Sequence, residues 1–314
     1  MSRLAKTLNG AIFFTGFLPS FTRIGLAARR VGWESLTPDF SGQRWLVTGA
    51  STGLGKEISL AAARAGADVL AVARSRDKLE ALASETAAAP GSISPRAADL
   101  SLVGATRALV AELAASNTPF DVLVNNVGVL FNEPTTTAEG LDAGFAVNLL
   151  NQYVLTEGLK AHGLLARDGC VVTMASGGLY NVPLSIPALQ SHEDYNGSLA
   201  YASHKRAQAA LNGWWREQEL DGVRYYVMHP GWADTPGVQT ALPEFRKLLG
   251  TLLRTPEEGA DTAIWLAAKR PEQGNDNGIW FDRALRPAHR LFGTRAGDSP
   301  ADLVEYLEET ASTV

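Results

Sequence analysis

A tyrosine and a lysine four residues apart, Tyr201 and Lys205, form the pair in this sequence best suited to acid–base chemistry. On a helix, residues four apart share one face, so the ammonium group can approach the phenol. A nearby positive charge favours the phenolate and lowers the tyrosine pKa toward neutral pH. Such a tyrosine can give a proton to a carbonyl oxygen or take one from an alcohol. The pair alone is common on helix surfaces, so its weight depends on the residues upstream.

The upstream residues form a glycine-rich turn. The apolar run Trp45–Val47 leads to Thr48 and Gly49, and Gly53 and Gly55 open an alanine-rich helical segment. Glycines at these places permit a sharp turn, the approach of backbone to a pyrophosphate and close packing of helix on strand. This context predicts a dinucleotide site, with a ligand-free strand–turn–helix connection as the alternative. The predicted cofactor contacts here are Gly49, Ser51, Thr52, Gly53, Leu54 and Gly55.

These motifs resemble those of the short-chain dehydrogenase/reductase family. The spacing of Thr48, Gly49, Gly53 and Gly55 is that of its single-domain branch, and the resemblance covers about residues 42–285. The other signals follow in the family's order: Asp99 with Leu100, Asn125 to Gly128, Asn148, Ser176, Tyr201 with Lys205, and Pro230 with Gly231.

The resemblance implies an oxidoreductase that moves a hydride between a nicotinamide cofactor and a carbonyl or alcohol carbon. Tyr201 matches the general acid/base, and Lys205 the residue that lowers its pKa and contacts the nicotinamide ribose. Ser176 matches the catalytic serine that holds the substrate oxygen. Asn148 matches the residue that supports a water between the lysine and solvent. The cofactor contacts implied beyond the glycine turn are Asp99, Leu100, Asn125, Gly128, Tyr201, Lys205, Pro230, Gly231 and Thr235.

Two further stretches, Ser176–Gly178 and Met228–Val238, resemble one subgroup, the member 12-like dehydrogenase/reductases, whose substrate is poorly defined. The serine and the tyrosine also lie farther apart than in most family members. The extra segment, Leu179–Leu199, is therefore predicted to be a loop beside the substrate site.

Two side chains near the pair receive no catalytic role. Tyr195 is a rival to Tyr201, but the residue four positions further on is Leu199, which carries no charge. His204 lies inside the motif but faces away from Tyr201 and Lys205 on a helix.

The end of the second strand indicates the cofactor. An acidic residue there would bind the ribose 2′-hydroxyl of NAD, but this chain has Ala73–Arg76 instead. An arginine fork suits a phosphate. We therefore predict NADP, with Arg74 as the main discriminator and Ser51 as a helper; use of NAD as well is the alternative, with a solvent-facing arginine.

Alternating apolar runs and helical segments predict an α/β fold: a single Rossmann-type domain with a doubly wound parallel sheet in three layers, α/β/α. The domain spans residues 42–285, between an N-terminal arm (1–41) and a C-terminal tail with a short helix (286–314). The predicted strands are Trp45–Val47, Ala67–Ala73, Ile93–Ala98, Phe120–Val124, Cys170–Ala175, Val223–Met228 and Gly278–Phe281. The predicted helices are Leu54–Ala65, Arg76–Ala88, Leu102–Ser116, two within Ala138–Ala166, Leu199–Glu219, Pro243–Leu253, Pro256–Ala268 and Pro300–Thr310.

Composition narrows the function class. An apolar fraction of 46% over 314 residues is ample for a buried core, and a net charge of -5 gives no electrostatic basis for binding nucleic acid. The single cysteine, Cys170, excludes an intramolecular disulfide, and no metal-ligand spacing is present. The predicted partner is a small-molecule substrate, with an apolar carbonyl or secondary alcohol favoured; a homo-oligomer stays open.

The N-terminal residues differ in charge from the rest of the chain. Met1–Val31 carries five basic residues and no acidic one, and its apolar stretch Ala11–Leu18 is too short to span a bilayer. Two interpretations stay open: an arm packed on the enzyme, over the substrate cleft, and a basic anchor lying in a membrane interface. The packed arm is favoured because Gly16, Pro19 and Gly25 interrupt a long helix. The predicted location is the cytoplasm, with peripheral membrane association under the second interpretation.

Other functions also stay open. A non-catalytic NADP-binding sensor or scaffold would not need the four catalytic positions, all of which are filled. Sugar-nucleotide epimerases use the same pair, but usually carry a different glycine spacing and a larger C-terminal region. Reduction of a membrane lipid or sterol would fit the apolar arm.

Overall fold

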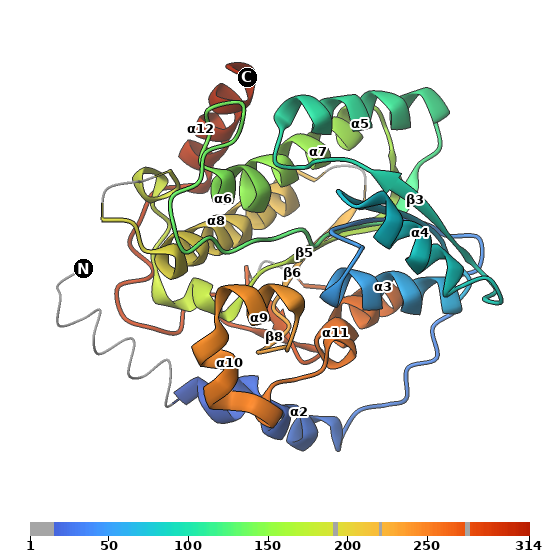
Figure 1. The fold of residues 1–314 in the computed structure, drawn as a ribbon, viewed down its shortest axis with the longest axis horizontal. Helices are drawn as coiled ribbons and strands as arrows, with labels where there is room; N and C mark the ends of the chain where they lie inside the picture. Colours follow the sequence, from blue (N-terminus) through green and yellow to red (C-terminus); the bar gives the residue numbers. More distant parts are fainter. Residues whose placement is uncertain (1–15, 191–193, 220–221, 274–276) are drawn as a thin grey trace.

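The computed structural model describes residues 16–190, 194–219, 222–273 and 277–314, which fold around one central sheet (Figure 1). The sheet runs in the order β3-β2-β1-β4-β5-β6-β7-β8. Neighbouring strands from β3 to β7 pair in parallel, and β8 returns antiparallel to β7. The strands are β1 (Arg44–Thr48), β2 (Asp68–Ala73), β3 (Ser92–Ala97), β4 (Phe120–Asn125), β5 (Leu165–Met174), β6 (Arg224–Met228), β7 (Ile279–Phe281) and β8 (Ala284–Arg286).

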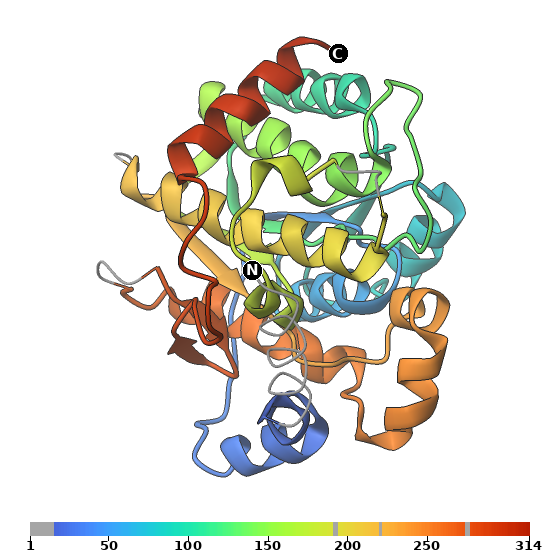
Figure 2. The ribbon, with the colours of Figure 1, turned by 90° about the vertical axis from the view of Figure 1, so that its left-hand side faces the viewer.

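Helices cover both faces of this sheet, which confirms the predicted three-layer architecture (Figure 2). Residues of α3, α4 and α11 share a core cluster with one face, and residues of α5, α7, α8 and α12 share a second cluster with the other. The α-helices are α2 (Arg23–Arg30), α3 (Gly53–Arg64), α4 (Arg76–Ser84), α5 (Val103–Ser116), α6 (Ala143–Phe145), α7 (Asn151–Ala161), α8 (Gly197–Glu217), α9 (Pro236–Ala241), α10 (Pro243–Leu249), α11 (Pro256–Lys269) and α12 (Pro300–Ser312).

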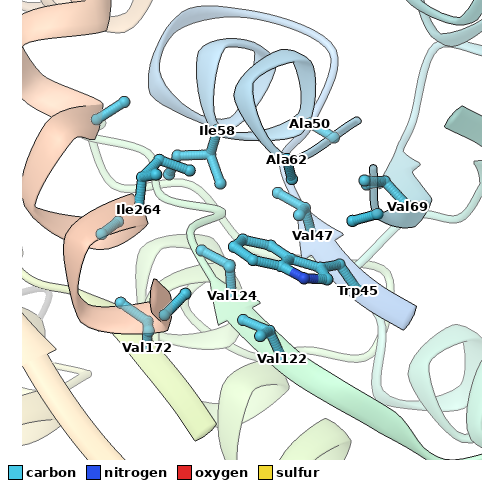
Figure 3. Packing of buried hydrophobic residues seen from close by; sticks show 14 of the residues in the cluster. Trp45, Val47, Ala50, Ile58, Ala62, Val69, Val122, Val124, Val172 and Ile264 are labelled. Carbon is cyan, nitrogen blue, oxygen red and sulfur yellow. The ribbon is translucent and has the colours of Figure 1, made fainter. Parts of the chain in front are cut away.

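Strand β1 shows how the core fixes the sheet. Successive side chains of a strand point to opposite faces. Trp45 and Val47 lie in the cluster with Ile58 of α3 and Ile264 of α11 (Figure 3), whereas Leu46 belongs to the cluster on the opposite face. A slip of one residue would exchange these faces, so burial on both sides holds the register and places the loops at the strand ends.

The structure corrects the prediction just before the fifth strand. The helix expected to reach Ala166 ends at Ala161, and β5 already begins at Leu165. Gly163 has a φ of 64°, a left-handed conformation typical of a helix end, and Leu165 pairs with Phe120 of β4. Pairing with a neighbouring strand thus overrides the local helical pattern.

The predicted last strand is followed by another, because β8 returns from Phe281 through a two-residue turn. Asp282 and Arg283 have φ values of 50° and 56°. Aspartate is common at the first position of such turns, but Arg283 stands where glycine is usual, so the hairpin signal in the sequence was incomplete. Buried ion pairs from Arg254 and Arg29 hold Asp282 instead, so contacts from distant segments make this turn.

The N-terminal segment packs against the protein from the first described residues, while most of the apolar stretch Ala11–Leu18 lies outside them. Phe17 and Phe21 are buried in a cluster that includes Tyr180 and Phe281. Among the described residues, no helix has the length and apolar character needed to cross a bilayer.

Candidate active site

The carboxyl ends of the parallel strands bring the predicted site residues to one edge of the sheet, where ligands of such sheets bind. The two halves of this edge differ: the glycine turn lies after β1, and the tyrosine–lysine pair lies beside β5. Gly49 and Arg74 directly follow β1 and β2, and the second residues after β3, β5 and β6 are Asp99, Ser176 and Pro230.

Three of the side chains predicted to carry the chemistry meet between β5 and α8. The side chain of Asn196 caps the start of α8, which fixes the first turn of the helix. The Ser176 hydroxyl lies near enough to the Tyr201 phenol to act on its pKa. One turn later, Lys205 Nζ lies 5.3 Å from the centre of the Tyr201 ring and donates to Met174 O at 2.8 Å. The end of β5 therefore supplies both the serine and the anchor of the lysine.

Burial governs the protonation of this pair. It raises the pKa of Tyr201 to about 12, and the nearby Ser176 hydroxyl offsets that rise only in part. Burial also lowers the pKa of Lys205 to about 7. The net change in the Tyr201 pKa is opposite to the expected lowering by the lysine, because desolvation disfavours the charged form of both groups. At neutral pH the phenol holds its proton, and Lys205 gains or loses one readily.

Asn148 lies in a π-helical turn, Ala146–Leu150, between α6 and α7. Its Oδ1 accepts from Val129 N at 2.7 Å, and its Nδ2 donates to Val129 O at 2.8 Å. A Cβ on Gly128 would lie 3.2 Å from Lys205 Nζ and 3.4 Å from Asn148 Oδ1. The absence of a side chain at Gly128 thus leaves room for the lysine and the asparagine to come together.

His204, to which the sequence assigned no role, contacts this site. Its ring contacts the predicted catalytic asparagine: His204 Nδ1 is 3.3 Å from Asn148 Nδ2. Its Nε2 lies 2.8 Å from Leu189 O, so Nε2 carries the proton and Nδ1 accepts. Burial lowers the pKa of His204, which favours this neutral form. A histidine directly before Lys205 was the signal that the sequence offered.

The glycine turn is built as a backbone cradle that fits a dinucleotide. A Cβ on Gly55 would lie 2.4 Å from Gly49 O, and one on Gly49 would lie 2.9 Å from Val127 Cα. Helix α3 begins at Gly53, and Thr52 at its N-cap makes no side-chain capping bond there. The first amides of α3 are therefore left to a ligand, and a helix N-terminus favours phosphate.

Asn126, rather than Asn125, ties the ends of β1 and β4 together. Asn126 Nδ2 donates to Thr48 O at 2.8 Å, and Asn126 N donates to Thr48 Oγ1 at 3.0 Å. Asn125 is buried, and its Nδ2 donates to Thr156 Oγ1 at 3.0 Å. The side chain of Asn125 therefore supports α7.

The remaining predicted cofactor residues lie around this cradle. Arg74 is exposed and forms no ion pair within the described ranges, whereas Arg76 pairs with Glu80 at 2.8 Å. Thr235 caps α9, a helix that the sequence did not predict, and lies 3.3 Å from the Cβ position of Gly53. The chain after β6 thus approaches the glycine turn. Asp99 Oδ1 accepts from Ser101 N at 3.0 Å, and Leu100 is buried in the core.

The extra segment before α8 is folded onto the protein. Two short 3-10 turns, Gly177–Asn181 and Ile186–Ala188, shape it. Leu179 and Leu189 are buried, and residues 191–193 lie outside the described residues. Through Leu189 O the segment reaches His204, so it is connected to the site's interior.

Comparison with known proteins identifies the family. A model for the short chain dehydrogenases matches residues 43–244. The chain belongs to the short-chain dehydrogenase family. Its relatives include dehydrogenase/reductase SDR family member 12 of Bos taurus, which is 34% identical over 89% of this chain and 92% of the relative. A polyprenol dehydrogenase of Danio rerio is 31% identical over 74% of this chain and 75% of the relative.

Solved structures agree with this short-chain dehydrogenase fold. A putative NAD(P) dependent gluconate 5-dehydrogenase from Beutenbergia cavernae, solved with bound NADP, is 29% identical with a TM-score of 0.56, over 73% of this chain and 91% of that one. The predicted family, the likeness to member 12 and the NAD(P)-binding Rossmann fold are therefore confirmed. The protein is an oxidoreductase of the class that interconverts carbonyls and alcohols.

Proposed function

We propose that this protein is an NADP-linked enzyme that interconverts a carbonyl and an alcohol, with Tyr201 as the general acid/base. The proposal rests on the arrangement of three side chains: Lys205 Nζ lies over the Tyr201 ring, 5.3 Å from its centre, and the Ser176 hydroxyl lies near the phenol. When bound, NADPH supplies the hydride for reduction. The chain's own residues hold the oxygen and move its proton.

Each catalytic side chain has one task. Tyr201 keeps its phenolic proton at neutral pH and gives it to the oxygen of the reduced carbonyl. Ser176 donates to the same oxygen and sets its distance from the phenol. Lys205, buried with a pKa near 7, restores the proton lost by Tyr201. Asn148 holds the backbone at Val129 and supports the path by which protons pass between Lys205 and solvent.

NADP is favoured over NAD by the end of β2. Arg74 is exposed there, and its fork of N–H groups is free of acidic partners among the described residues. An arginine without a carboxylate partner is available to bind a 2′-phosphate. Gly49, Gly53 and Gly55 would hold the pyrophosphate on the first amides of α3.

An apolar substrate is the class we propose. The segment after Ser176 presents buried apolar residues, including Leu179 and Leu184, beside the site. The similarity to a polyprenol dehydrogenase supports the same class. The alternative, a non-catalytic NADP-binding sensor, is disfavoured because Ser176, Tyr201 and Lys205 meet in a working arrangement.

The test is oxidation of NADPH by the purified protein with a panel of apolar aldehydes and ketones, with NADH in parallel. Tyr201→Phe removes the acid, and Tyr195→Phe is the matched control, because the Tyr195 hydroxyl donates to Phe131 O at 3.1 Å in the neighbouring segment. We expect turnover in the wild type and in Tyr195→Phe only. Tight NADPH binding with no turnover across the panel would favour the sensor.

A further inference from the structure

Phe21 of the N-terminal segment lies between the two loops that border the candidate active site. One loop follows β5 and begins with Ser176, and the other follows β6 and begins with His229 and Pro230. Both loops present a glycine to Phe21, namely Gly177 and Gly231. The side chain of Phe21 is fully buried.

The ring of Phe21 occupies the space over Gly177. A Cβ on Gly177 would lie 2.4 Å from Phe21 Cε2, a distance that real Cβ atoms do not adopt. Gly177 is not among the glycines with positive φ, so close approach of the ring, rather than backbone conformation, is what requires a glycine. Because Gly177 follows Ser176 directly, the ring packs against the backbone that carries the serine.

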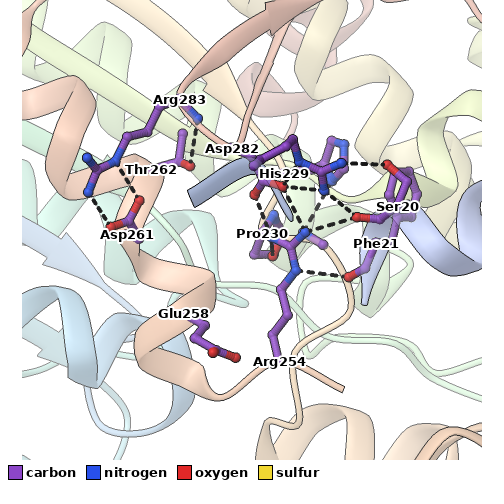
Figure 4. A network of polar contacts seen from close by, with 12 residues as sticks. Ser20, Phe21, His229, Pro230, Arg254, Glu258, Asp261, Thr262, Asp282 and Arg283 are labelled. Atoms are coloured by element: carbon purple, nitrogen blue, oxygen red, sulfur yellow. Dashed lines mark hydrogen bonds and ion pairs between the residues drawn. The ribbon is translucent and has the colours of Figure 1, made fainter. Parts of the chain in front are cut away.

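The backbone of Phe21 binds the second loop. Phe21 O accepts from Trp232 N at 2.9 Å and from Arg254 Nε at 2.9 Å (Figure 4). A Cβ on Gly231 would lie 2.7 Å from the same oxygen, and Gly231 has a φ of 75°. One residue of the N-terminal segment therefore contacts the loop of the serine with its ring and the loop after β6 with its carbonyl.

A buried ion pair fastens this arrangement. Arg254 Nη1 lies 2.6 Å from Asp282 Oδ1, with side chains 1% and 2% exposed, and Arg254 Nη1 also donates to Pro230 O at 3.0 Å (Figure 4). Arg29 of α2 binds the same carboxylate at 2.6 Å through Nε. Arg254 Nη2 donates to Ser20 O at 3.2 Å. The segment is thus held on both sides of Phe21, at Ser20 and at Arg29, by the buried side chains of Arg254 and Asp282.

We propose that Phe21 is a positioning residue of the active site: it acts through Gly177 on Ser176, and through Trp232 and Gly231 on the loop that leads to Thr235. This inference rests on the proposed function, since Ser176 is the serine that would hold the substrate oxygen. Phe21 couples the substrate side of the site to the cofactor side. The N-terminal segment is therefore a working part of the catalytic unit.

The test compares Phe21→Ala with Phe17→Ala in the full chain. Phe17 is buried in the same cluster, with ring centres 4.7 Å from Phe21, yet it is not among the atoms nearest to Gly177 or Gly231. Both substitutions remove buried apolar area, so both lower stability. We expect only Phe21→Ala to lower kcat, by about 10- to 100-fold, because small displacements of positioning groups are costly.

A reciprocal variant tests the contact itself. Gly177→Ala places a methyl group against Phe21 Cε2 and should lower kcat in the wild type. In the Phe21→Ala background the methyl has room, so Gly177→Ala should cost less there. If Gly177→Ala lowers kcat by the same factor in both backgrounds, the contact between Phe21 and Gly177 is not the means by which Ser176 is positioned.

Hydrogen–deuterium exchange gives a measurement that does not depend on turnover. In Phe21→Ala, amides of residues 176–181 and of Trp232 should exchange faster than in Phe17→Ala, under conditions where both variants are folded. Unchanged exchange in both loops, or equal effects of the two variants on exchange and on kcat, would overturn the inference. Absence of turnover in the wild type, with the exchange difference present, would instead count against the proposed function alone.

Discussion

The half of the site edge around the glycine turn and the half around α8 are built in different ways. Gly49, Gly53 and Gly55 form a cradle of backbone, in which the requirement at each position is local and steric. Around Tyr201 and Lys205 the site consists of buried polar side chains, whose partners come from distant segments. The first half is suited to holding a ligand. In the second half, burial shifts the pKa values of the tyrosine and the lysine.

From this difference we expect that cofactor binding and proton transfer can be changed largely independently in this protein. A change at the cradle should alter affinity for the cofactor, while a change beside α8 should alter turnover and its pH dependence. The predictions below test that separation, starting from the largest effect.

Replacing Tyr201 by Phe removes the proposed acid and leaves the ring in place. We expect kcat to fall by about 100- to 10,000-fold, the range for loss of a general acid. The Kd for NADPH, measured by fluorescence titration, should stay within about twofold of the wild type, since this loss leaves the binding groups in place. Turnover that survives in this variant would show that another group supplies the proton.

Replacing Lys205 by Met should separate activity from stability. We expect kcat to fall by about 100-fold, because the proton supply to Tyr201 is lost. Burial lowers the pKa of Lys205 from 10.5 to about 7, so the folded protein loses its proton more readily than the unfolded chain does. Burial of the charged Lys205 ammonium therefore lowers the free energy of unfolding by its full amount below pH 7, and this loss vanishes above about pH 10.5.

The expected effect on stability follows from the direction of the Lys205 pKa shift. Urea unfolding at pH 6 should show Lys205→Met more stable than the wild type by about 1–4 kcal/mol, with the gain shrinking as pH rises. In the wild type, kcat/KM for reduction should decline as pH rises through about 7. A gain in stability that does not depend on pH would refute this account of Lys205.

Replacing Arg74 by Ala probes the half of the sheet edge that holds the glycine turn. Loss of charge-assisted hydrogen bonds to a phosphate should raise the Kd for NADPH by about 10- to 100-fold and leave the Kd for NADH nearly unchanged. Arg76→Ala is the matched control, since Arg76 already pairs with Glu80. Equal losses for both cofactors would show that Arg74 does not read the 2′-phosphate.

Replacing His204 should give the smallest effect. His204→Ala removes the hydrogen bond that steadies Asn148, worth about 1 kcal/mol, so kcat should fall by about fivefold. His204→Gln retains a donor for Leu189 O and an acceptor for Asn148, and should recover most of the activity. If the glutamine variant is as slow as the alanine variant, the hydrogen bonds are not the cause.

The local features of both halves of the edge could be predicted from the sequence. The spacing of Gly49, Gly53 and Gly55 specifies a turn within a few residues, and Tyr201 and Lys205 lie one helical turn apart. Strand positions followed from apolar runs that are buried on both faces. The family motifs then gave the order of the remaining residues.

Apart from the short local helix α9, the main features that the sequence did not predict join distant segments. Asp282 adopts its turn conformation because Arg254 and Arg29 bind it, and His204 finds Asn148 only after two helices pack together. Phe21 contacts Gly177, which lies about half the length of the chain away in the sequence. No periodicity or turn rule carries such contacts, because they arise from tertiary packing.

The most direct test of the central claim is a single comparison of Tyr201→Phe with Arg74→Ala. For each variant, the Kd for NADPH and the kcat at saturating NADPH would be measured with one carbonyl substrate. The account predicts that Tyr201→Phe keeps its affinity and loses turnover, while Arg74→Ala loses affinity and keeps most of its turnover at saturation. Parallel losses of affinity and turnover in both variants would contradict the separation of the two halves.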